Sequence, residues 1–150
     1  MRDAIDDAPP GRVYVMVVED GLDYAGIGAL RSTAMKDRGL TGAIIEGSVW
    51  DTAQIMRWQV PVFGPGAVPS TSINHCRHAG TNVLIICAGQ TVSGDEIIVA
   101  DVDGVAVAPA EVAVEVQKKA QELDDIEHRM LPYIAKYWSM RQAVEQFGRI

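Results

Sequence analysis

The sequence contains little cysteine: only Cys76 and Cys87 among 150 residues, and neither belongs to a Cys-x-x-Cys pair. Two such cysteines do not build a disulfide framework. The apolar runs fall short of the roughly 20 residues that span a membrane. The charged stretch over residues 1–7 has no signal-peptide core. We therefore expect a reducing, cytoplasmic location and no membrane partner.

Basic residues are also scarce. The chain has 13 Lys and Arg against 20 Asp and Glu, a net charge of −7 and a pI near 4.8. No basic cluster is available to neutralise a phosphate backbone, so the sequence predicts no nucleic-acid partner. The acidity makes cations the natural ligands. With 48% hydrophobic and 22% charged residues, the composition is that of one globular domain over residues 1–150.

The first half alternates apolar runs with helical patterns. We predict strands over residues 13–18, 42–46 and 60–63 and helices over residues 28–38 and 52–58. The first two strands lack polar alternation, which is typical of strands buried on both faces. Gly39 is the expected C-terminal cap of the first helix, and the carboxylate of Asp51 is the expected N-terminal cap of the second. Such alternation implies parallel strands with helical crossovers.

The second half has a different sequence pattern. Residues 64–82 are rich in Gly, Pro, Ser and Thr and read as loop, and hairpin-type turns then separate apolar segments. We predict mainly antiparallel strands over residues 83–88, 96–100 and 105–108. Cys87, inside an apolar run, is expected to be buried. A helix is predicted from Pro109 to about Met130, and Pro132 starts a second helical stretch rich in aromatic residues.

Several segments, in this order, carry a resemblance to a known family. They are Pro10-Gly11-x-Val13-x-Val15, the 28–39 helix, Gly42–Val49, Val60–Phe63, Cys87-Ala88-Gly89, Gly94–Val105 and the Ala-rich tail helix. The chain resembles the class II 4-hydroxy-4-methyl-2-oxoglutarate / 4-carboxy-4-hydroxy-2-oxoadipate aldolase family, which shares its fold with the regulator of ribonuclease E activity A.

This resemblance implies an α/β fold, the swivelling β/β/α domain, in which a parallel βαβ half is joined by antiparallel strands and long C-terminal helices. It also implies a homotrimer, or a hexamer built from two trimers. Family members usually carry a further N-terminal segment before the position of Met1. We therefore expect that this chain lacks that segment or packs differently at that edge.

The resemblance further implies a Mg²⁺ or Mn²⁺ cofactor, which assists carbon–carbon cleavage of a 2-oxo acid. The family signature is an acidic residue on a first glycine turn, followed 21 and 22 positions later by an Arg-Asp pair. Here these positions hold Ala29, Trp50 and Asp51. Only the second acid remains, so Asp51 is the predicted metal ligand.

Each of these residues also has a plainer interpretation. Asp51 is either a metal ligand and catalytic residue or only a helix cap. Trp50, in the place of the substrate-clamping arginine, lacks a charged donor. It either has a catalytic and substrate-binding role or fills core or interface space. The backbone amides of Gly28, Ala29 and Leu30 start a helix and can bind a substrate carboxylate, although most glycine turns are only turns.

Other candidates lie farther along the chain. Glu127 matches an acidic residue that family members contribute to a neighbouring subunit's site, but helix-surface glutamates are usually solvated. His75-Cys76-Arg77-His78 fits no standard zinc spacing and is interpreted as a mobile loop; since the family often has a lysine near His75, this loop could still border the substrate entrance. Asp101 and Asp103 belong to a turn interpreted as structural.

Three functions remain open from the sequence. The first is a metal-dependent lyase acting on a 2-oxo (hydroxy)dicarboxylic acid, with oxaloacetate decarboxylation as a side activity. The second is a non-catalytic member that binds a protein or a small carboxylate. The third is a lyase with changed chemistry, in which Trp50 packs against a more apolar substrate. Fold alone does not decide among them.

Overall fold

The computed structural model describes residues 2–148. The chain divides into two compact units, one of residues 1–94 with 100–105 and one of residues 95–99 with 106–150. Each unit is described by itself. A single domain over residues 1–150 stays a prediction.

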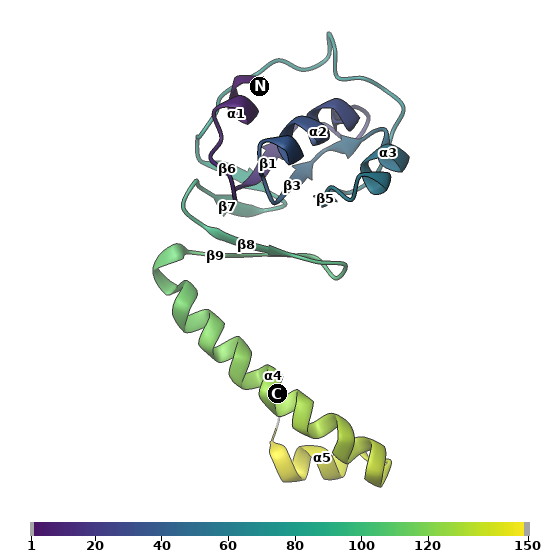
Figure 1. Ribbon diagram of the computed structural model, residues 1–150, viewed down its shortest axis with the longest axis vertical. Helices are drawn as coiled ribbons and strands as arrows, with labels where there is room; N and C mark the ends of the chain where they lie inside the picture. Colours follow the sequence, from purple (N-terminus) through teal and green to yellow (C-terminus); the bar gives the residue numbers. More distant parts are fainter. Residues whose placement is uncertain (1, 149–150) are drawn as a thin grey trace. The chain divides into compact units, whose positions relative to one another are not determined.

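The first unit is built on a three-stranded parallel sheet in the order β1 (Val13–Val17), β3 (Gly42–Glu46), β5 (Val62–Phe63). Figure 1 shows α2 (Ala29–Asp37) and α3 (Thr52–Arg57) beside this sheet. The predicted parallel βαβ half is therefore confirmed. Strand β3 is buried along most of its length, whereas β1 is only half-buried because it lies at the edge of the sheet. Burial on both faces was thus wrong for β1.

The core of this unit joins the sheet to its helices. Its buried side chains come from α1 (Arg2–Asp6), α2, α3, the strands and the segment just before β5. They are Ile5, Ile27, Met35, Ala43, Ile45, Val49, Ile55 and Val60. Gly39 ends α2 as expected: it has a φ of +81°, which glycine adopts without strain, and its amide donates to the Lys36 carbonyl at 2.9 Å.

Two very short strands form a separate parallel pair, which the sequence did not predict. They are β2 (Ala25–Ile27) and β4 (Ser48–Val49), and all five residues are buried. Ala25 pairs with Ser48, and Ile27 pairs with Val49. Both strands contain small residues and are too short to show an apolar period. This pair matters for function because the chain leaves β2 into α2 and leaves β4 toward α3.

Antiparallel strands are confirmed in this part of the chain, but the strand over residues 90–92 was not predicted. The strand over residues 105–108 has the predicted bounds, and the other two predicted strands are shorter than expected. β6 (Ile85–Cys87) pairs with β7 (Gln90–Val92) through a turn at Ala88 and Gly89, whose φ angles of 48° and 77° suit a two-residue hairpin turn. The side chain of Cys87 is 7% exposed, so its predicted burial is confirmed. β8 (Ile97–Ala100) pairs with β9 (Val105–Ala108).

The turn between β8 and β9 is organised by one side chain. Asp101 Oδ1 accepts hydrogen bonds from the amides of Asp103, at 2.8 Å, and Gly104, at 3.2 Å. Aspartate favours such turns because its short carboxylate reaches the backbone two residues on. This geometry agrees with the structural interpretation of the Asp-x-Asp-Gly segment.

The second unit contains the longest helix. After a 3-10 turn, η1 (Ala110–Val112), α4 runs without interruption over Ala113–Tyr137 and α5 over Met140–Phe147. The predicted helix break before Pro132 was therefore wrong. Proline costs an interior hydrogen bond, but Met130 just before it is 1% exposed where α4 packs on α5, and that packing favours a continuous helix. No helix among residues 2–148 is long and apolar enough to cross a membrane.

Candidate functional site

Two turns of the first unit meet at one edge. Because β2 and β4 are parallel neighbours, the segments that follow them begin side by side. Gly28 follows β2 and starts α2, while Trp50 and Asp51 follow β4 and precede α3. The Trp50 amide donates to the Ile27 carbonyl at 3.1 Å, which fixes this meeting point. The carboxyl ends of parallel strands are where open α/β sheets usually place their ligands.

Asp51 connects the two turns through its side chain. Its Oδ2 accepts a hydrogen bond from the backbone amide of Ala29, at 3.2 Å, in the first turn of α2. Gly28, the N-terminal cap residue of α2, has no side chain that could do this. A carboxylate there is favoured by the free amides and by the helix dipole. The structure therefore brings Asp51 and Ala29 together across 22 residues of sequence.

The prediction that the Asp51 side chain caps α3 was wrong. Asp51 adopts the left-handed conformation, with φ of 55°, and its side chain makes no capping hydrogen bond to α3. This backbone conformation accompanies a carboxylate bonded to α2 instead. Aspartate tolerates it better than most residues.

Trp50 lies against the start of α2. A Cβ placed on Gly28 would overlap the Trp50 indole at Nε1 and Cδ1, so the ring reaches the α-carbon of Gly28. Glycine at position 28 is what permits this approach. The Trp50 side chain is nevertheless 36% exposed, so one part of the ring faces Gly28 and another faces solvent. Whether it lines a substrate site stays a prediction.

Two arginines, Arg31 and Arg57, lie near the two turns in the sequence. Arg31 is half-buried and its Nη1 donates to the Gly26 carbonyl at 2.5 Å, so one guanidinium nitrogen is engaged by backbone. Burial raises the pKa of the nearby Tyr14 hydroxyl, and the Arg31 charge opposes that rise. Arg57 is the exposed last residue of α3. Leu30, on the first turn of α2, is 87% exposed and adds an apolar group beside the site.

The carboxylate that the structure places at the meeting point of the two turns is that of Asp51. Among residues 2–148, no three or more His, Cys, Asp or Glu side chains lie close enough together to hold a metal ion. Asp51 offers oxygen, which Mg²⁺ and Mn²⁺ prefer, and Mg²⁺ commonly keeps several waters beside one or two carboxylates. The donor set therefore fits a weakly held, largely hydrated hard cation. It does not fit zinc, which prefers three or four N or S ligands.

Glu127 belongs to the other compact unit. It is an exposed residue near the middle of α4. Its predicted role at the site of a neighbouring subunit stays a prediction.

The His75 loop is locally folded. His75 stacks on Tyr24, with ring centroids 4.2 Å apart, and the amides of His75 and Cys76 both donate to the Ser72 carbonyl. His78 instead contacts Thr81 Oγ1 at 2.9 Å. The stack ties this loop to the residue before β2, and among the residues that the structure describes no hydrogen bond or ion pair joins the loop to Asp51.

One polar contact was missed from the sequence. Glu46, at the end of β3, accepts a hydrogen bond from the Ala88 amide at 2.8 Å and so ties the β6–β7 turn to the parallel sheet. Burial, and then the charge of Glu46, raise the pKa of the neighbouring Cys87 thiol. The feature of the sequence that pointed to such a contact was a glutamate at the end of an otherwise apolar strand. Its partner, 42 residues away, was not visible in the sequence.

With this geometry in place, comparison with known proteins assigns the class. The family model described as RraA-like (Aldolase/RraA) matches residues 1–107. The chain therefore belongs to the RraA-like family, which confirms both the resemblance and the α/β fold class drawn from the sequence.

The chain is 29% identical to an uncharacterized protein of Methanocaldococcus jannaschii, over 88% of this chain and 63% of that protein. It is 28% identical to a putative 4-hydroxy-4-methyl-2-oxoglutarate aldolase of Halalkalibacterium halodurans, over 85% and 62%. It also matches 23% of the length of the Legionella pneumophila protein DlpA, at 27% identity. The chain thus spans less than two thirds of each of these relatives.

Solved structures show the same fold. An uncharacterized protein from Pseudomonas syringae superposes with a TM-score of 0.92 at 23% identity, over 97% of this chain and 68% of that one. Streptomyces coelicolor RraAS2, described as an unusual member of the RNase ES inhibitor RraA protein family, gives a TM-score of 0.71 at 23% identity, over 83% and 63%. The proteins similar to this chain thus include one named as a putative aldolase and one described as a member of the RNase ES inhibitor RraA family.

Proposed function

We propose that this chain is a divalent-metal-dependent lyase of low activity, which cleaves a 4-hydroxy-2-oxo acid and releases pyruvate. One observation carries the proposal: the Asp51 carboxylate lies where the segments after β2 and β4 meet and is held there by the Ala29 amide. The family membership and the aldolase relative support the reaction class.

Asp51 has the central role in this proposal. One of its carboxylate oxygens bonds to α2, and the carboxylate as a whole is the protein's oxygen donor for Mg²⁺ or Mn²⁺. When bound, such a cation polarises the 2-oxo group and favours the enolate that carbon–carbon cleavage requires. The hydrogen bond to Ala29 restricts the carboxylate, so its position depends on α2 as well as on its own backbone.

The first turn of α2 and Trp50 form the rest of the proposed substrate site. The amides of Gly28, Ala29 and Leu30 begin the helix, and that of Ala29 is already engaged by Asp51. Trp50 supplies an apolar surface and one neutral N–H donor, without the two-pronged charge of arginine. Loss of one good transition-state donor costs about 3 kcal/mol, so we expect a slow reaction.

The acid that would help relay protons is also missing, because Ala29 has no ionisable group. Glu127 from a neighbouring copy is the proposed substitute, which requires the homotrimer, or the hexamer of two trimers, that the family resemblance implies. A chain that stays monomeric at micromolar concentration in light scattering would remove this role of Glu127.

A non-catalytic binding member is the alternative function. It is favoured by the same two positions, since neither Ala29 nor Trp50 carries the charge that the reaction uses. In that case the protein would bind a small carboxylate or a protein partner without turnover. The structural neighbour described as a member of the RNase ES inhibitor RraA family is consistent with this function.

Pyruvate release decides between the two functions. A panel of 4-hydroxy-2-oxo acids and oxaloacetate should be tested with Mg²⁺, with Mn²⁺ and with chelator. The lyase proposal predicts slow release that needs the metal and is lost in Asp51→Asn. Asp37→Asn, which changes an exposed aspartate at the far end of α2, is the matched control and should behave like the wild type. No release from any substrate would favour the binding function.

A further inference from the structure

The two segments that meet at the candidate site contain one anion and one cation. Among residues 26–32 and 47–54 the charged side chains are Arg31 and Asp51. The Asp51 carboxylate is at the meeting point, where it accepts from the Ala29 amide. The contacts of Arg31 therefore decide whether these segments offer a substrate a positive charge besides a metal bound at Asp51.

Arg31 is directed toward the strands. Its Nη1 donates to the carbonyl of Gly26 in β2. Burial raises the pKa of the Tyr14 hydroxyl on β1, and the charge of Arg31 acts in the opposite direction, which places this guanidinium near β1. Among residues 2–148 no hydrogen bond or ion pair joins Arg31 to Asp51. The contacts of Arg31 thus belong to the fold of the first unit.

The indole of Trp50 has its polar edge against the backbone. The ring atoms nearest to a Cβ placed on Gly28 are Nε1, Cδ1 and Cε2, which all belong to the five-membered ring. The N–H edge therefore lies over Gly28, and the six-membered hydrocarbon ring is directed away from it. Trp50 is only partly covered. The part of its ring that remains for a ligand is therefore apolar.

Leu30 places a second large apolar side chain beside the same hydrogen bond. Leu30 follows Ala29 in the first turn of α2, and Trp50 precedes Asp51. Each is thus the sequence neighbour of one partner of the bond between Asp51 and the Ala29 amide. Single exposed apolar residues are common on protein surfaces, but here two of them flank the one carboxylate of the site.

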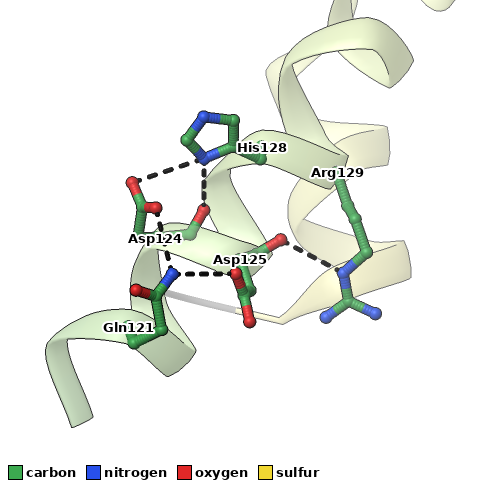
Figure 2. A network of polar contacts seen from close by, with 5 residues as sticks. All are labelled: Gln121, Asp124, Asp125, His128 and Arg129. Atoms are coloured by element: carbon green, nitrogen blue, oxygen red, sulfur yellow. Dashed lines mark hydrogen bonds and ion pairs between the residues drawn. The ribbon is translucent and has the colours of Figure 1, made fainter. Parts of the chain in front are cut away.

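The cations next to Glu127 on α4 are directed onto their own helix. His128 Nδ1 lies 2.9 Å from the Asp124 carbonyl and 3.3 Å from Oδ1 of the same residue (Figure 2). Arg129 Nε donates to the Asp125 carbonyl at 3.3 Å, also drawn in Figure 2. Glu127 itself is an anion. A neighbouring copy that supplied Glu127 would therefore bring negative charge to the substrate.

We propose that the substrate of this site is a 4-hydroxy-2-oxo monocarboxylic acid whose C4 carries an apolar group instead of a second carboxylate. The 2-oxo acid end lies at Asp51, and the C4 group lies against Trp50 and Leu30. A second carboxylate there would lose water without gaining a charged partner. This inference rests on the proposed lyase function and narrows the substrate class of the same site.

The cleavage releases an uncharged product beside pyruvate. The 4-hydroxyl gives up its proton, the C3–C4 bond breaks with its electron pair left on C3, and C4 becomes the carbonyl carbon of an aldehyde or ketone. A proton added to C3 completes pyruvate, so the step needs no oxidant or reductant. C4 is only two bonds from the 2-oxo carbon, and its substituent therefore stays close to Asp51 and to the neighbouring Trp50.

A matched pair of substrates tests the inference. 4-Hydroxy-4-methyl-2-oxopentanoate differs from 4-hydroxy-4-methyl-2-oxoglutarate by a methyl group in place of the second carboxylate. With Mn²⁺ present, kcat/KM per bond cleaved should be higher for the pentanoate by about tenfold or more. 4-Hydroxy-2-oxo-4-phenylbutanoate should be cleaved at least as well as the pentanoate. A kcat/KM for the glutarate that equals or exceeds that for the pentanoate would overturn the inference and leave the lyase function standing.

Binding of two analogues without the 4-hydroxyl separates the inference from turnover. 2-Oxo-4-phenylbutanoate and 2-oxoglutarate are titrated calorimetrically into the Mn²⁺-loaded protein. The phenyl compound should bind about tenfold more tightly or better. If none of the three 4-hydroxy acids is cleaved, the lyase function fails, and this pair still decides about the apolar ligand. Equal or tighter binding of 2-oxoglutarate would then overturn the inference as well.

Variants of Trp50 test its part in the selection. Trp50→Arg supplies a guanidinium and should shift the ratio of the two kcat/KM values toward the glutarate by about tenfold or more, whereas Trp50→Phe should keep the preference of the wild type. Trp58→Phe is the control, because the Trp58 carbonyl accepts from Lys36 at the far ends of α2 and α3. Melting temperatures show which variants fold. If Trp50→Arg does not fold, Trp50→Ala replaces it and should abolish the preference. An unchanged ratio in the folded variant would show that Trp50 does not select the substrate.

Discussion

The indole of Trp50 lies on the α-carbon of Gly28, at the first turn of α2. Because of this contact, Trp50, which the resemblance places at the family's arginine position, is packed against the turn where the resemblance places the family's first acid. The two altered positions of the signature, Ala29 and Trp50, are therefore neighbours in space. They are linked to the one retained acid through the bond between Asp51 and the Ala29 amide.

Gly28→Ala should destabilise the fold. A Cβ at this position overlaps the indole, and overpacking of this kind costs about 1–3 kcal/mol. Urea unfolding gives the loss. Trp50→Ala removes the overlapping ring, so Gly28→Ala should cost much less in that background, and the double-mutant cycle should show a clear coupling energy. Equal costs in both backgrounds would mean that the indole does not occupy this place.

Cys87 should react more slowly with thiol reagents than Cys76. Burial and the charge of Glu46 raise the pKa of Cys87, so less of it is thiolate at a given pH, and its side chain is only 7% exposed. Glu46→Gln keeps an acceptor for the Ala88 amide but removes the charge. The pKa of Cys87 should then fall toward its ordinary value, and its alkylation rate at pH 8 should rise. Mass spectrometry of each labelled cysteine against pH measures both rates.

Restoring the acid and the arginine of the family signature should raise the rate of pyruvate formation. Ala29→Asp with Trp50→Arg supplies the first acid and the guanidinium on a scaffold that already holds Asp51 at the meeting point. We expect at least a tenfold gain in pyruvate formation, or about 1.4 kcal/mol of barrier. Removal of Trp50 also leaves Gly28 uncovered, so stability must be measured beside activity. A folded double variant without gain would show that the site has been remodelled and would favour the binding function.

The elements that were predicted from the sequence are those whose apolar residues form a continuous run or recur at helical spacing. The apolar runs of β1 and β3 and the helix between them were visible, and Gly39 marked the end of that helix. β2 and β4 were not predicted, because two or three small residues show no alternation. Pro132 was predicted to start a new helix, because the sequence shows that a proline removes a hydrogen bond from a helix interior. The packing of Met130 on α5, which favours a continuous helix, cannot be read from the sequence.

In the candidate site too, the residues were predicted from the sequence, whereas a contact between distant segments was not. The family resemblance grouped Gly28, Ala29, Trp50 and Asp51, and the parallel pairing of β2 and β4 brings the two segments that hold them together. The partner of the Asp51 carboxylate was assigned wrongly, because a local rule favours capping of the helix that follows. The left-handed backbone at Asp51, with its side chain on α2, depends on a contact between segments far apart in sequence.

Manganese binding to wild type and to Asp51→Asn, measured by titration calorimetry, tests the central claim most directly. The amide keeps the shape and an acceptor for the Ala29 amide but loses the charge that a hard cation requires. We predict a single weak site in the wild type and in the Asp37→Asn control, and no measurable binding in Asp51→Asn, with all three proteins folded. Equal manganese affinity in Asp51→Asn and the wild type would contradict the account and leave Asp51 as a cap of α2 only.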